Sequence, residues 1–265
     1  MLIGQISDSH ILPLGEKSHG IIDPAQRLLA AVKAMNAASP DLVLHTGDIA
    51  HHGTPEAYRV AREILAQLKA PLFAIPGNHD DRAKMRAAFS DENWMPSKDQ
   101  ATAFIQYTID AGPLNIIMLD SLVPGEVSGA LCKSRLEFLH AQLSRDSRPT
   151  IIALHHPPMA PGLDGFAKVG LQGADQLAGI LEKQGQVIRI LAGHNHRSVV
   201  GVCGGVATIV APSCAFPFAF NAKKGASLSI AFEPPGAALH LWDENSGLVS
   251  HVISIGDWPE PKSLR

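Results

Sequence analysis

Carboxylate, amide and imidazole side chains recur in five short motifs, and each motif follows a short apolar run. The motifs are Asp8-Ser9-His10, Gly47-Asp48, Gly77-Asn78-His79-Asp80, His155-His156 and Gly193-His194-Asn195-His196. Such side chains suit divalent Mn, Fe, Zn or Co. The candidate metal ligands are Asp8, His10, Asp48, Asn78, His155, His194 and His196. Seven ligands are too many for one four-coordinate zinc ion and suit two divalent ions that share a carboxylate.

The elements that must position these motifs are short strands rich in Ile, Leu and Val. They are predicted at 2–7, 41–46, 71–76, 150–154 and 187–192, because short apolar runs of this kind are typical of buried strands. Helices are predicted at 24–37, 55–68, 134–144 and 174–183, with Asp23 and Thr54 as N-caps of the first two. Alternating strands and helices predict a parallel sheet, which carries its chemistry where the strands end.

Beyond residue 197 the pattern changes to short β-prone segments separated by Gly, Pro and Asn. These segments cover 199–202, 206–210, 227–232, 237–242 and 248–255. We predict that 197–265 completes a second sheet facing the first and covers the site, within a single domain spanning 1–265. The proline-rich stretch 211–220 is predicted to be a loop over the site.

Composition limits the class of protein. Hydrophobic residues make up 46% of the chain and charged residues 18%, as in folded globular proteins. A net charge of -3 with scattered basic residues gives no electrostatic footprint for long nucleic acid. No apolar run reaches the roughly 20 residues that span a bilayer, and a candidate ligand at position 8 argues against a preceding signal peptide. Three cysteines without a CxxC pair favour a reducing compartment, so the expected location is the cytoplasm.

Taken in order, the five motifs match the pattern D-x-H, G-D, G-N-H-[DE], H and G-H-x-H of the calcineurin-like metallophosphoesterases. The chain resembles this superfamily over at least residues 1–197. The connecting segments narrow the resemblance to the bacterial class III phosphodiesterases, a group that includes glycerophosphodiesterases and cyclic-nucleotide phosphodiesterases. These segments are Leu14-Gly15-Glu16-Lys17, Gly20, Asp23, Gly53-Thr54-Pro55-Glu56, Tyr58 and His79-Asp80-Asp81.

The resemblance implies an α/β fold: a four-layer αββα sandwich of two mixed sheets flanked by helices, with a dinuclear metal site at the C-terminal ends of strands. It also implies roles for the ligands. These are Asp8, His10 and His196 on the first metal, Asn78, His155 and His194 on the second, and Asp48 as the bridge. His156 is the rival of His155, which is favoured because it ends the strand and matches the family position.

Other polar residues have weaker assignments. His79 is the predicted catalytic acid or hydrogen-bond donor, oriented by Asp80 or Asp120. Weak contacts with substrate are predicted for Asn78, His79 and His19, and a surface position without a function is an equal alternative for His19. Weaker candidates for substrate contact are Arg82, Arg197, Phe216 and Phe218, with core packing as the favoured role of both aromatic residues. His51 and His52 are interpreted as loop residues near the rim of the site rather than as ligands.

Two departures separate the chain from other members of the superfamily. The Asp-Arg-Gly that grips phosphate in protein Ser/Thr phosphatases is missing after Asp48, and His51 stands where purple acid phosphatases place a tyrosine ligand. The resemblance therefore implies a phosphoric diester hydrolase that cleaves small phosphodiesters, of the glycerophosphodiester or 3′,5′-cyclic nucleotide type, with a metal-bound hydroxide.

Two alternative functions remain open at this point. One is a nuclease or nucleotide pyrophosphohydrolase on the same scaffold, and the other is a non-catalytic binding scaffold. The expected partner is a small-molecule phosphodiester, without a membrane or long nucleic acid. A homo-oligomer, with 121–132 as its candidate contact hairpin, is suggested by the relatives.

Overall fold

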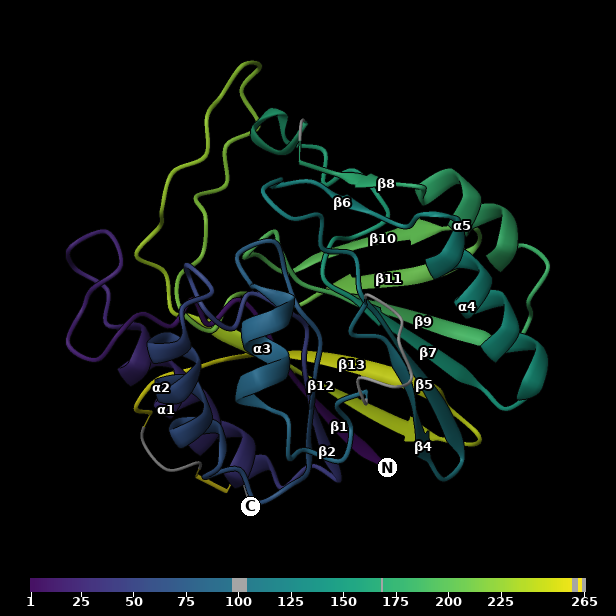
Figure 1. Cartoon of the computed structure of the whole chain (residues 1–265), viewed down its shortest axis with the longest axis horizontal. Helices are drawn as coiled ribbons and strands as arrows, with labels where there is room; N and C mark the ends of the chain where they lie inside the picture. Colours follow the sequence, from purple (N-terminus) through teal and green to yellow (C-terminus); the bar gives the residue numbers. More distant parts are fainter. Residues whose placement is uncertain (97–103, 168, 259–261, 264–265) are drawn as a thin grey trace.

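Parallel strands form the centre of two mixed sheets in the computed structural model, which describes residues 1–96, 104–167, 169–258 and 262–263 (Figure 1). The first sheet has the order β13-β12-β1-β2-β3. Its strands are β1 (Leu2–Ile6), β2 (Leu42–His45), β3 (Leu72–Ala74), β12 (Gly236–Asp243) and β13 (Gly247–Ser254). The first three are parallel, whereas β12 runs antiparallel to β1 and β13 runs antiparallel to β12.

The second sheet has the order β10-β11-β9-β7-β5-β4. Its strands are β4 (Tyr107–Ala111), β5 (Leu114–Leu119), β7 (Thr150–Leu154), β9 (Val187–Ala192), β10 (Val199–Cys203) and β11 (Val206–Val210). The four central strands are parallel, and the two edge strands, β4 and β10, are antiparallel to their neighbours. A two-stranded sheet pairs β6 (Gly129–Ala130) with β8 (Leu171–Gln172).

Helices cover the outer face of each sheet. The helices are α1 (Pro24–Ala38), α2 (Pro55–Leu65), α3 (Arg82–Ala88), α4 (Lys133–Arg145) and α5 (Ala174–Leu181), with a 3-10 turn η2 (Asp164–Phe166). The predicted N-caps are confirmed: the Asp23 side chain accepts from the Gln26 amide at 3.0 Å, and the Thr54 hydroxyl accepts from the Ala57 amide at 3.2 Å. The short helix α3 was not predicted.

Three apolar cores separate the four layers. In β7, Ile151 and Ala153 face a core between the two sheets, whereas Ile152 and Leu154 face a core shared with α4 and α5. This alternation follows from the two-residue period of a strand. A third core packs α1, α2 and α3 on the first sheet. The predicted αββα sandwich is therefore confirmed, with α1–α3 on one side and α4 and α5 on the other (Figure 1).

The C-terminal part of the chain divides between the two sheets, which corrects the prediction that 197–265 completes only the second. Strands β10 and β11 extend the second sheet, whereas β12 and β13 pair with β1 and extend the first. The pattern of β-prone residues indicates strands but not their pairing partners. The final residues 259–261 and 264–265 of that range lie outside the described residues.

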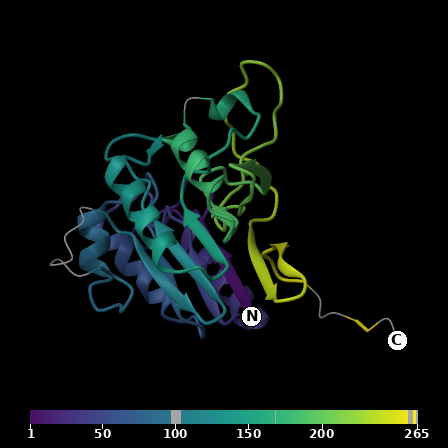
Figure 2. The ribbon, with the colours of Figure 1, turned by 90° about the vertical axis from the view of Figure 1, so that its right-hand side faces the viewer.

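Between β11 and β12 the chain forms a long projecting segment, 217–233 (Figures 1 and 2). The predicted strand 227–232 is wrong, because this part makes only an isolated bridge between Phe218 and Ile230. The predicted loop 211–220 does lack regular strands. Within the described ranges, no helix combines the length and the hydropathy needed to cross a bilayer.

Candidate metal centre

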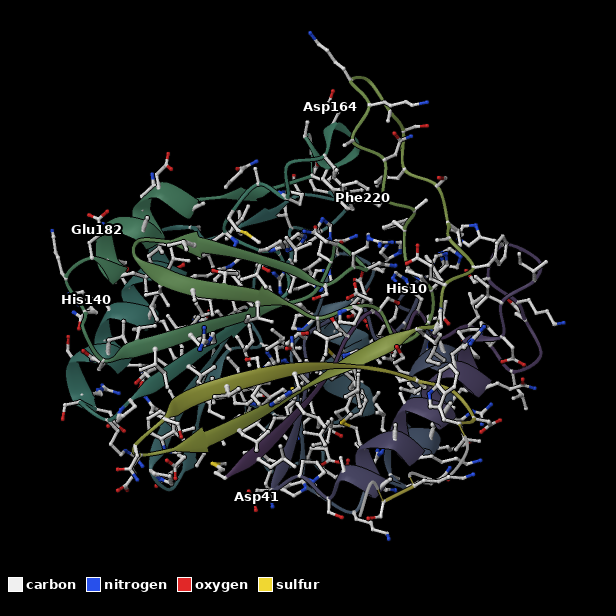
Figure 3. The ribbon with its side chains drawn as sticks, turned by 180° about the vertical axis from the view of Figure 1, so that it is seen from behind. His10, Asp41, His140, Asp164, Glu182 and Phe220 are labelled. Atoms are coloured by element: carbon white, nitrogen blue, oxygen red, sulfur yellow. The ribbon has the colours of Figure 1, made fainter. Side chains whose placement is uncertain are left out.

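All seven predicted ligands come together where five parallel strands end. Asp8 and His10 follow β1, Asp48 follows β2 and Asn78 follows β3, all in the first sheet. The remaining three come from the second sheet, with His155 after β7 and both His194 and His196 after β9. Figure 3 labels His10, one member of this cluster. Six of the seven are buried and Asn78 is half-buried. Because both sheets supply ligands, the cluster lies across the junction of the two sheets.

The first group of possible ligands contains Asp8, His10, Asp48 and His196. His10 Nε2 lies 3.0 Å from His196 Nε2 and 3.6 Å from Asp48 Oδ2, and His196 Nε2 lies 3.4 Å from Asp8 Oδ1. Two atoms that are each about 2.1 Å from one ion lie roughly 3.0–3.5 Å apart. The spacing of these four side chains therefore fits a shared cation. His196 Nδ1 donates to the Phe216 carbonyl at 2.8 Å, which turns Nε2 toward the group.

The second group has a similar spacing. His155 Nε2 lies 3.4 Å from Asp48 Oδ2 and 3.1 Å from Asn78 Oδ1, and His194 Nδ1 lies 2.9 Å from the same Asn78 oxygen. Asp48 Oδ2 thus faces both groups. This places a single carboxylate where a dinuclear centre needs a bridge.

Backbone carbonyls fix the orientation of the imidazoles in the second group. His155 Nδ1 donates to the Thr46 carbonyl at 2.8 Å, and His194 Nε2 donates to the Val169 carbonyl at 2.9 Å. The opposite nitrogen of each ring therefore points at the Asn78 amide oxygen, which only accepts hydrogen bonds. Lone pairs that face one another need a proton or a cation between them, so the arrangement fits a bound cation.

In the metal-free protein a proton takes the place of the cation beside Asp48. Burial opposes protonation of His155, but the Asp48 carboxylate outweighs it and raises the pKa of His155 to about 9. Burial lowers the pKa of His194 to about 4. A proton therefore lies between His155 and Asp48 at neutral pH, and a divalent cation must compete with it.

Left-handed backbone conformations aim the ligands. In the described part of the chain, seven non-glycine residues have positive φ, and five of them are candidate ligands: Asp8, His10, Asp48, His194 and His196. Each such residue costs about 1–3 kcal/mol and persists only where its surroundings hold it. Gly47, with φ of 99°, supplies the turn before Asp48 that only glycine adopts easily. The chain therefore bears strain at the positions that converge.

His155 and His156 differ in what their rings contact. Both nitrogens of His156 have protein partners, Nδ1 with the Ser121 hydroxyl at 2.8 Å and Nε2 with the Val127 carbonyl at 3.1 Å. His155 Nε2 instead faces the Asp48 carboxylate and the Asn78 amide oxygen, which are candidate ligands themselves. His156 still lies in a group with His155 and His194 whose ligand atoms are within 4.8 Å of one another, so the choice of His155 as the ligand stays a prediction.

His79 borders the cluster without entering either group around Asp48. Its backbone amide donates to Asp48 Oδ1 at 2.8 Å, and its Nδ1 donates to the His51 carbonyl at 2.8 Å. The prediction that Asp80 or Asp120 orients His79 is wrong. Both carboxylates are committed elsewhere, Asp80 to backbone amides and a tyrosine hydroxyl and Asp120 to Arg82.

The weaker candidates for substrate contact have structural partners. The guanidinium of Arg82 is held by Asp120, and that of Arg197 donates to the Phe218 carbonyl at 2.6 Å and to Glu233 at 3.0 Å. His19 is exposed, and its ring lies 5.4 Å from that of Phe216. Substrate contact by His19 stays a prediction.

Phe216 and Phe218 cover the cluster. Their rings lie 4.7 and 4.4 Å from that of His196, and Phe216 also lies 5.3 Å from the ring of His10. Phe216 directly precedes the projecting segment 217–233, and Phe218 lies at its start. That segment is tied down at its far end, where the Gly225 amide donates to Asp164 at 2.7 Å. The aromatic rings therefore exclude water from one side of the ligands.

His51, interpreted as a loop residue near the rim of the site, is half-buried and contacts both His10 and His79. Its Nδ1 lies 3.0 Å from His10 Nδ1, and its ring stacks on that of His79 at 4.9 Å. The three form a further group whose ligand atoms lie within 4.8 Å of one another. The sequence signal for a role of His51 was its position three residues after Asp48, where purple acid phosphatases place a tyrosine ligand.

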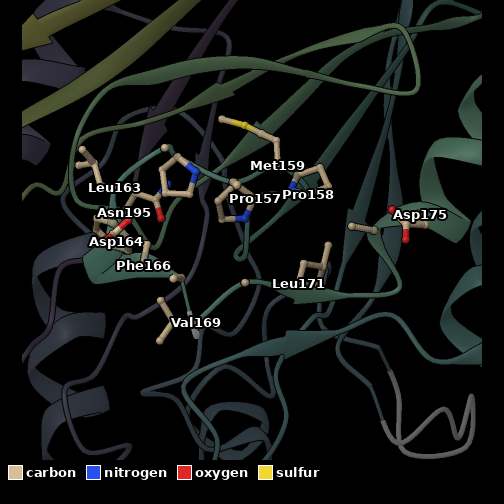
Figure 4. A pocket seen from close by; sticks show the side chains of 16 residues that line it. Pro157, Pro158, Met159, Leu163, Asp164, Phe166, Val169, Leu171, Asp175 and Asn195 are labelled. Atoms are coloured by element: carbon tan, nitrogen blue, oxygen red, sulfur yellow. The ribbon is translucent and has the colours of Figure 1, made fainter. Parts of the chain in front are cut away.

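A hollow of about 540 Å³ (Figure 4) has Val169 in its lining, and the carbonyl of Val169 accepts from the candidate ligand His194. Its walls are mainly apolar and include Pro157, Pro158, Met159, Leu163, Phe166 and Leu171. Asn195, which lies between two candidate ligands, also lines it. The hollow therefore provides apolar space next to the polar centre.

Comparisons with known proteins agree with this architecture. Residues 1–198 match the family described as Calcineurin-like phosphoesterase. A protein of Arcobacter nitrofigilis named probable glycerophosphodiester phosphodiesterase is 32% identical, over 98% of this chain and 96% of the relative. A cAMP/cGMP dual specificity phosphodiesterase of Mycobacterium tuberculosis is 36% identical, over 80% of this chain and 66% of the relative.

Solved structures share the fold at low identity. A dimetal phosphatase from Danio rerio superposes with a TM-score of 0.65 and 15% identity, covering 97% of this chain and 99% of that one. A purple acid phosphatase from Lupinus luteus gives a TM-score of 0.66 at 15% identity, over 96% of this chain and 53% of that one. The family match extends over three quarters of the sequence, and the relative from Arcobacter nitrofigilis matches 98% of it. The chain belongs to the calcineurin-like phosphoesterase family.

Proposed function

We propose that this protein is a dinuclear metal-dependent hydrolase of small phosphodiesters. The observation that carries the proposal is the convergence of imidazole nitrogens and carboxylate and amide oxygens, oriented by backbone hydrogen bonds, around one shared carboxylate oxygen. The names of the relatives, glycerophosphodiester and cyclic-nucleotide phosphodiesterases, supply the substrate class.

The proposed ligand sets follow the two groups. Asp8, His10 and His196 would hold one divalent ion, Asn78, His155 and His194 the other, and Asp48 would bridge them. When bound, such ions supply Lewis acidity, which lowers the pKa of water and offsets negative charge on phosphate oxygens. The set of histidine, carboxylate and amide ligands suits Mn, Fe, Zn or Co.

His79 is the proposed acid. Because its Nδ1–H is used by the His51 carbonyl, His79 can donate from Nε2 only as an imidazolium. In that form it would stabilise charge on the phosphate and protonate the departing alkoxide. Its stacking on His51 at 17° and its edge contact with His10 at 4.7 Å hold the ring at the border of the cluster. Asn78 and His19 are proposed to contact the substrate.

The adjoining hollow supports a substrate with an organic group on each side of the phosphate. Its apolar walls meet the polar centre at Asn195, so one ester substituent can occupy it while the phosphate lies among the ligands. The net charge of -3 disfavours long polyanions and favours small substrates.

The test compares a diester with a monoester. Purified protein is stripped with chelator, reloaded with Mn²⁺, Zn²⁺, Co²⁺ or Fe²⁺, and assayed with bis(p-nitrophenyl) phosphate and with p-nitrophenyl phosphate. We expect hydrolysis only after reloading and a preference for the diester, followed by turnover of glycerophosphodiesters or 3′,5′-cyclic nucleotides. A preference for the monoester, or cleavage of DNA, would contradict the proposal. A protein that binds no metal after reloading and hydrolyses neither compound would be a binding scaffold and not an enzyme.

Three further expectations belong to this proposal. The chain acts as one domain, with its C-terminal part covering the centre. The three cysteines are free, which fits a reducing cytoplasm. Association into a homo-oligomer through 121–132 stays a prediction, and light scattering coupled to size-exclusion chromatography tests it.

A further inference from the structure

His51 makes an unusual contact behind the proposed ligand His10. The Nδ1 atoms of the two rings lie 3.0 Å apart, with the ring planes at 65°. In a contact of this kind one nitrogen must carry the proton and the other must accept it. Which ring donates is decided by what the far side of His10 faces.

The far side of His10 faces the proposed cation. Its Nε2 lies 3.0 Å from His196 Nε2 and 3.6 Å from Asp48 Oδ2. A metal ligand must offer a bare nitrogen, so a bound His10 carries its proton on Nδ1. That proton can only point at His51, which must then accept on its own Nδ1 and be protonated on Nε2.

The same residue also holds the proposed acid. The carbonyl of His51 accepts from His79 Nδ1 at 2.8 Å, and the two rings stack. The loop itself is fixed, because the His51 amide donates to the Ile11 carbonyl at 2.9 Å and the preceding amide, of Ala50, donates to Asp80. His51 therefore cannot shift without moving both neighbours.

We propose that His51 is a positioning residue that selects the tautomer of the metal ligand His10 and orients His79. The inference rests on the proposed function, because it requires a cation at His10. Metal-bound histidines usually donate their second N–H to a carboxylate, a carbonyl or water, and such partners orient the ring and raise its basicity. A neutral imidazole in this place orients the ring without adding negative charge to the centre.

The test measures metal binding and needs no substrate. Competition with a chelator gives the affinity for Zn²⁺ or Mn²⁺ in the wild type, His51→Ala, His51→Asn and His51→Asp. His52→Ala is the matched control, because His52 is an exposed neighbour whose ring contacts His51 at 4.4 Å. Loss of an outer partner weakens metal binding about 10–100-fold.

We expect His51→Ala to weaken the binding of one of the two ions by this factor. His51→Asn should bind with near-wild-type affinity, because its amide oxygen can accept the hydrogen bond from His10. His51→Asp should bind more tightly. His52→Ala should behave as the wild type. Equal affinity in the wild type and His51→Ala would overturn the proposal, as would failure of His51→Asn to recover it. A protein that binds two ions in this pattern but cleaves no phosphodiester would contradict the proposed function alone, whereas a wild type that binds no metal would overturn both.

Imidazole ¹H–¹⁵N correlation spectra of the Zn²⁺-loaded wild type test the tautomers directly, even if the variants do not fold. The proposal expects a protonated Nδ1 on His10 and an unprotonated Nδ1 on His51. The opposite pair of tautomers would overturn it.

Discussion

His240 predicts a strong dependence of stability on pH that is independent of the proposed metal centre. This histidine is fully buried in β12, where its Nδ1 contacts the Ser250 hydroxyl at 2.8 Å and its Nε2 contacts Gln5 Oε1 at 3.0 Å. The Gln5 amide nitrogen donates to Thr46 and to the carbonyl of Ala192, so Gln5 Oε1 must accept the Nε2–H of a neutral His240. Burial, followed by the positive charge of Arg189, lowers the pKa of His240 to about 3.

The sign and size of the effect follow from this shift. An unfolded histidine titrates near 6.5, so below that pH the unfolded chain binds a proton that the folded protein refuses. The stabilisation is complete above about pH 6.5 and is lost as the pH falls toward 3, at about 1.4 kcal/mol per pH unit. Between about pH 8 and pH 4.5 the free energy of unfolding should fall by about 2.7 kcal/mol through His240 alone.

The assay is urea unfolding of metal-free wild type and His240→Gln, followed by tryptophan fluorescence. At neutral pH the variant should be less stable by about 1 kcal/mol, because one buried hydrogen bond changes. At about pH 4.5 the variant should equal or exceed the wild type, since it has no group to protonate at this position. All other titrating groups are shared and cancel in the difference. Equal losses of stability in the two proteins on acidification would refute the reasoning.

Three further outcomes are expected. His79→Ala should keep both ions by elemental analysis but lose about 10²–10⁴-fold in kcat; unchanged turnover would remove it from the mechanism. Gly193→Ala should lose bound metal by the same analysis, because the new methyl group would overlap the Ser7 hydroxyl and lie 2.8 Å from Asp8 Oδ2, which displaces that ligand. Arg82→Ala should lower the free energy of unfolding by about 3–5 kcal/mol in a denaturant titration, since it removes the guanidinium that is hydrogen-bonded to the fully buried Asp120 carboxylate.

The sequence predicted which side chains would gather, but not the turns that bring them together. Asp8 and His10 were predicted to follow the strand at 2–7. In the structure β1 ends at Ile6, and both residues converge because each has positive φ, 55° and 46°. The carboxyl ends of parallel strands are a robust basis for such a prediction, whereas the local turn that completes the geometry is not visible in a pattern of residue types.

Contacts between distant segments were the least predictable. His51 meets His10 and His79 through loops that follow three different strands, and no local spacing encodes that meeting. The pairing of β12 with β1 joins residues more than 230 positions apart, so the β-prone tail revealed strands without revealing their sheet. The helix α3 was missed because seven residues give too short an apolar period to recognise.

Because the candidate ligands lie at the junction of the two sheets, metal binding is coupled to the docking of one sheet, with its helices, on the other. Three of the five motifs are delivered by one half and two by the other, and Asp48 meets partners from each. Neither half alone could assemble a complete pair of binding positions. Cations that bind there would hold the two sheets together. A chain whose sheets docked wrongly could not bind them, so the amount of bound metal would measure the fraction of correctly folded protein. Ions present at about 100 times their dissociation constant would favour the docked state by about 2.7 kcal/mol for each site.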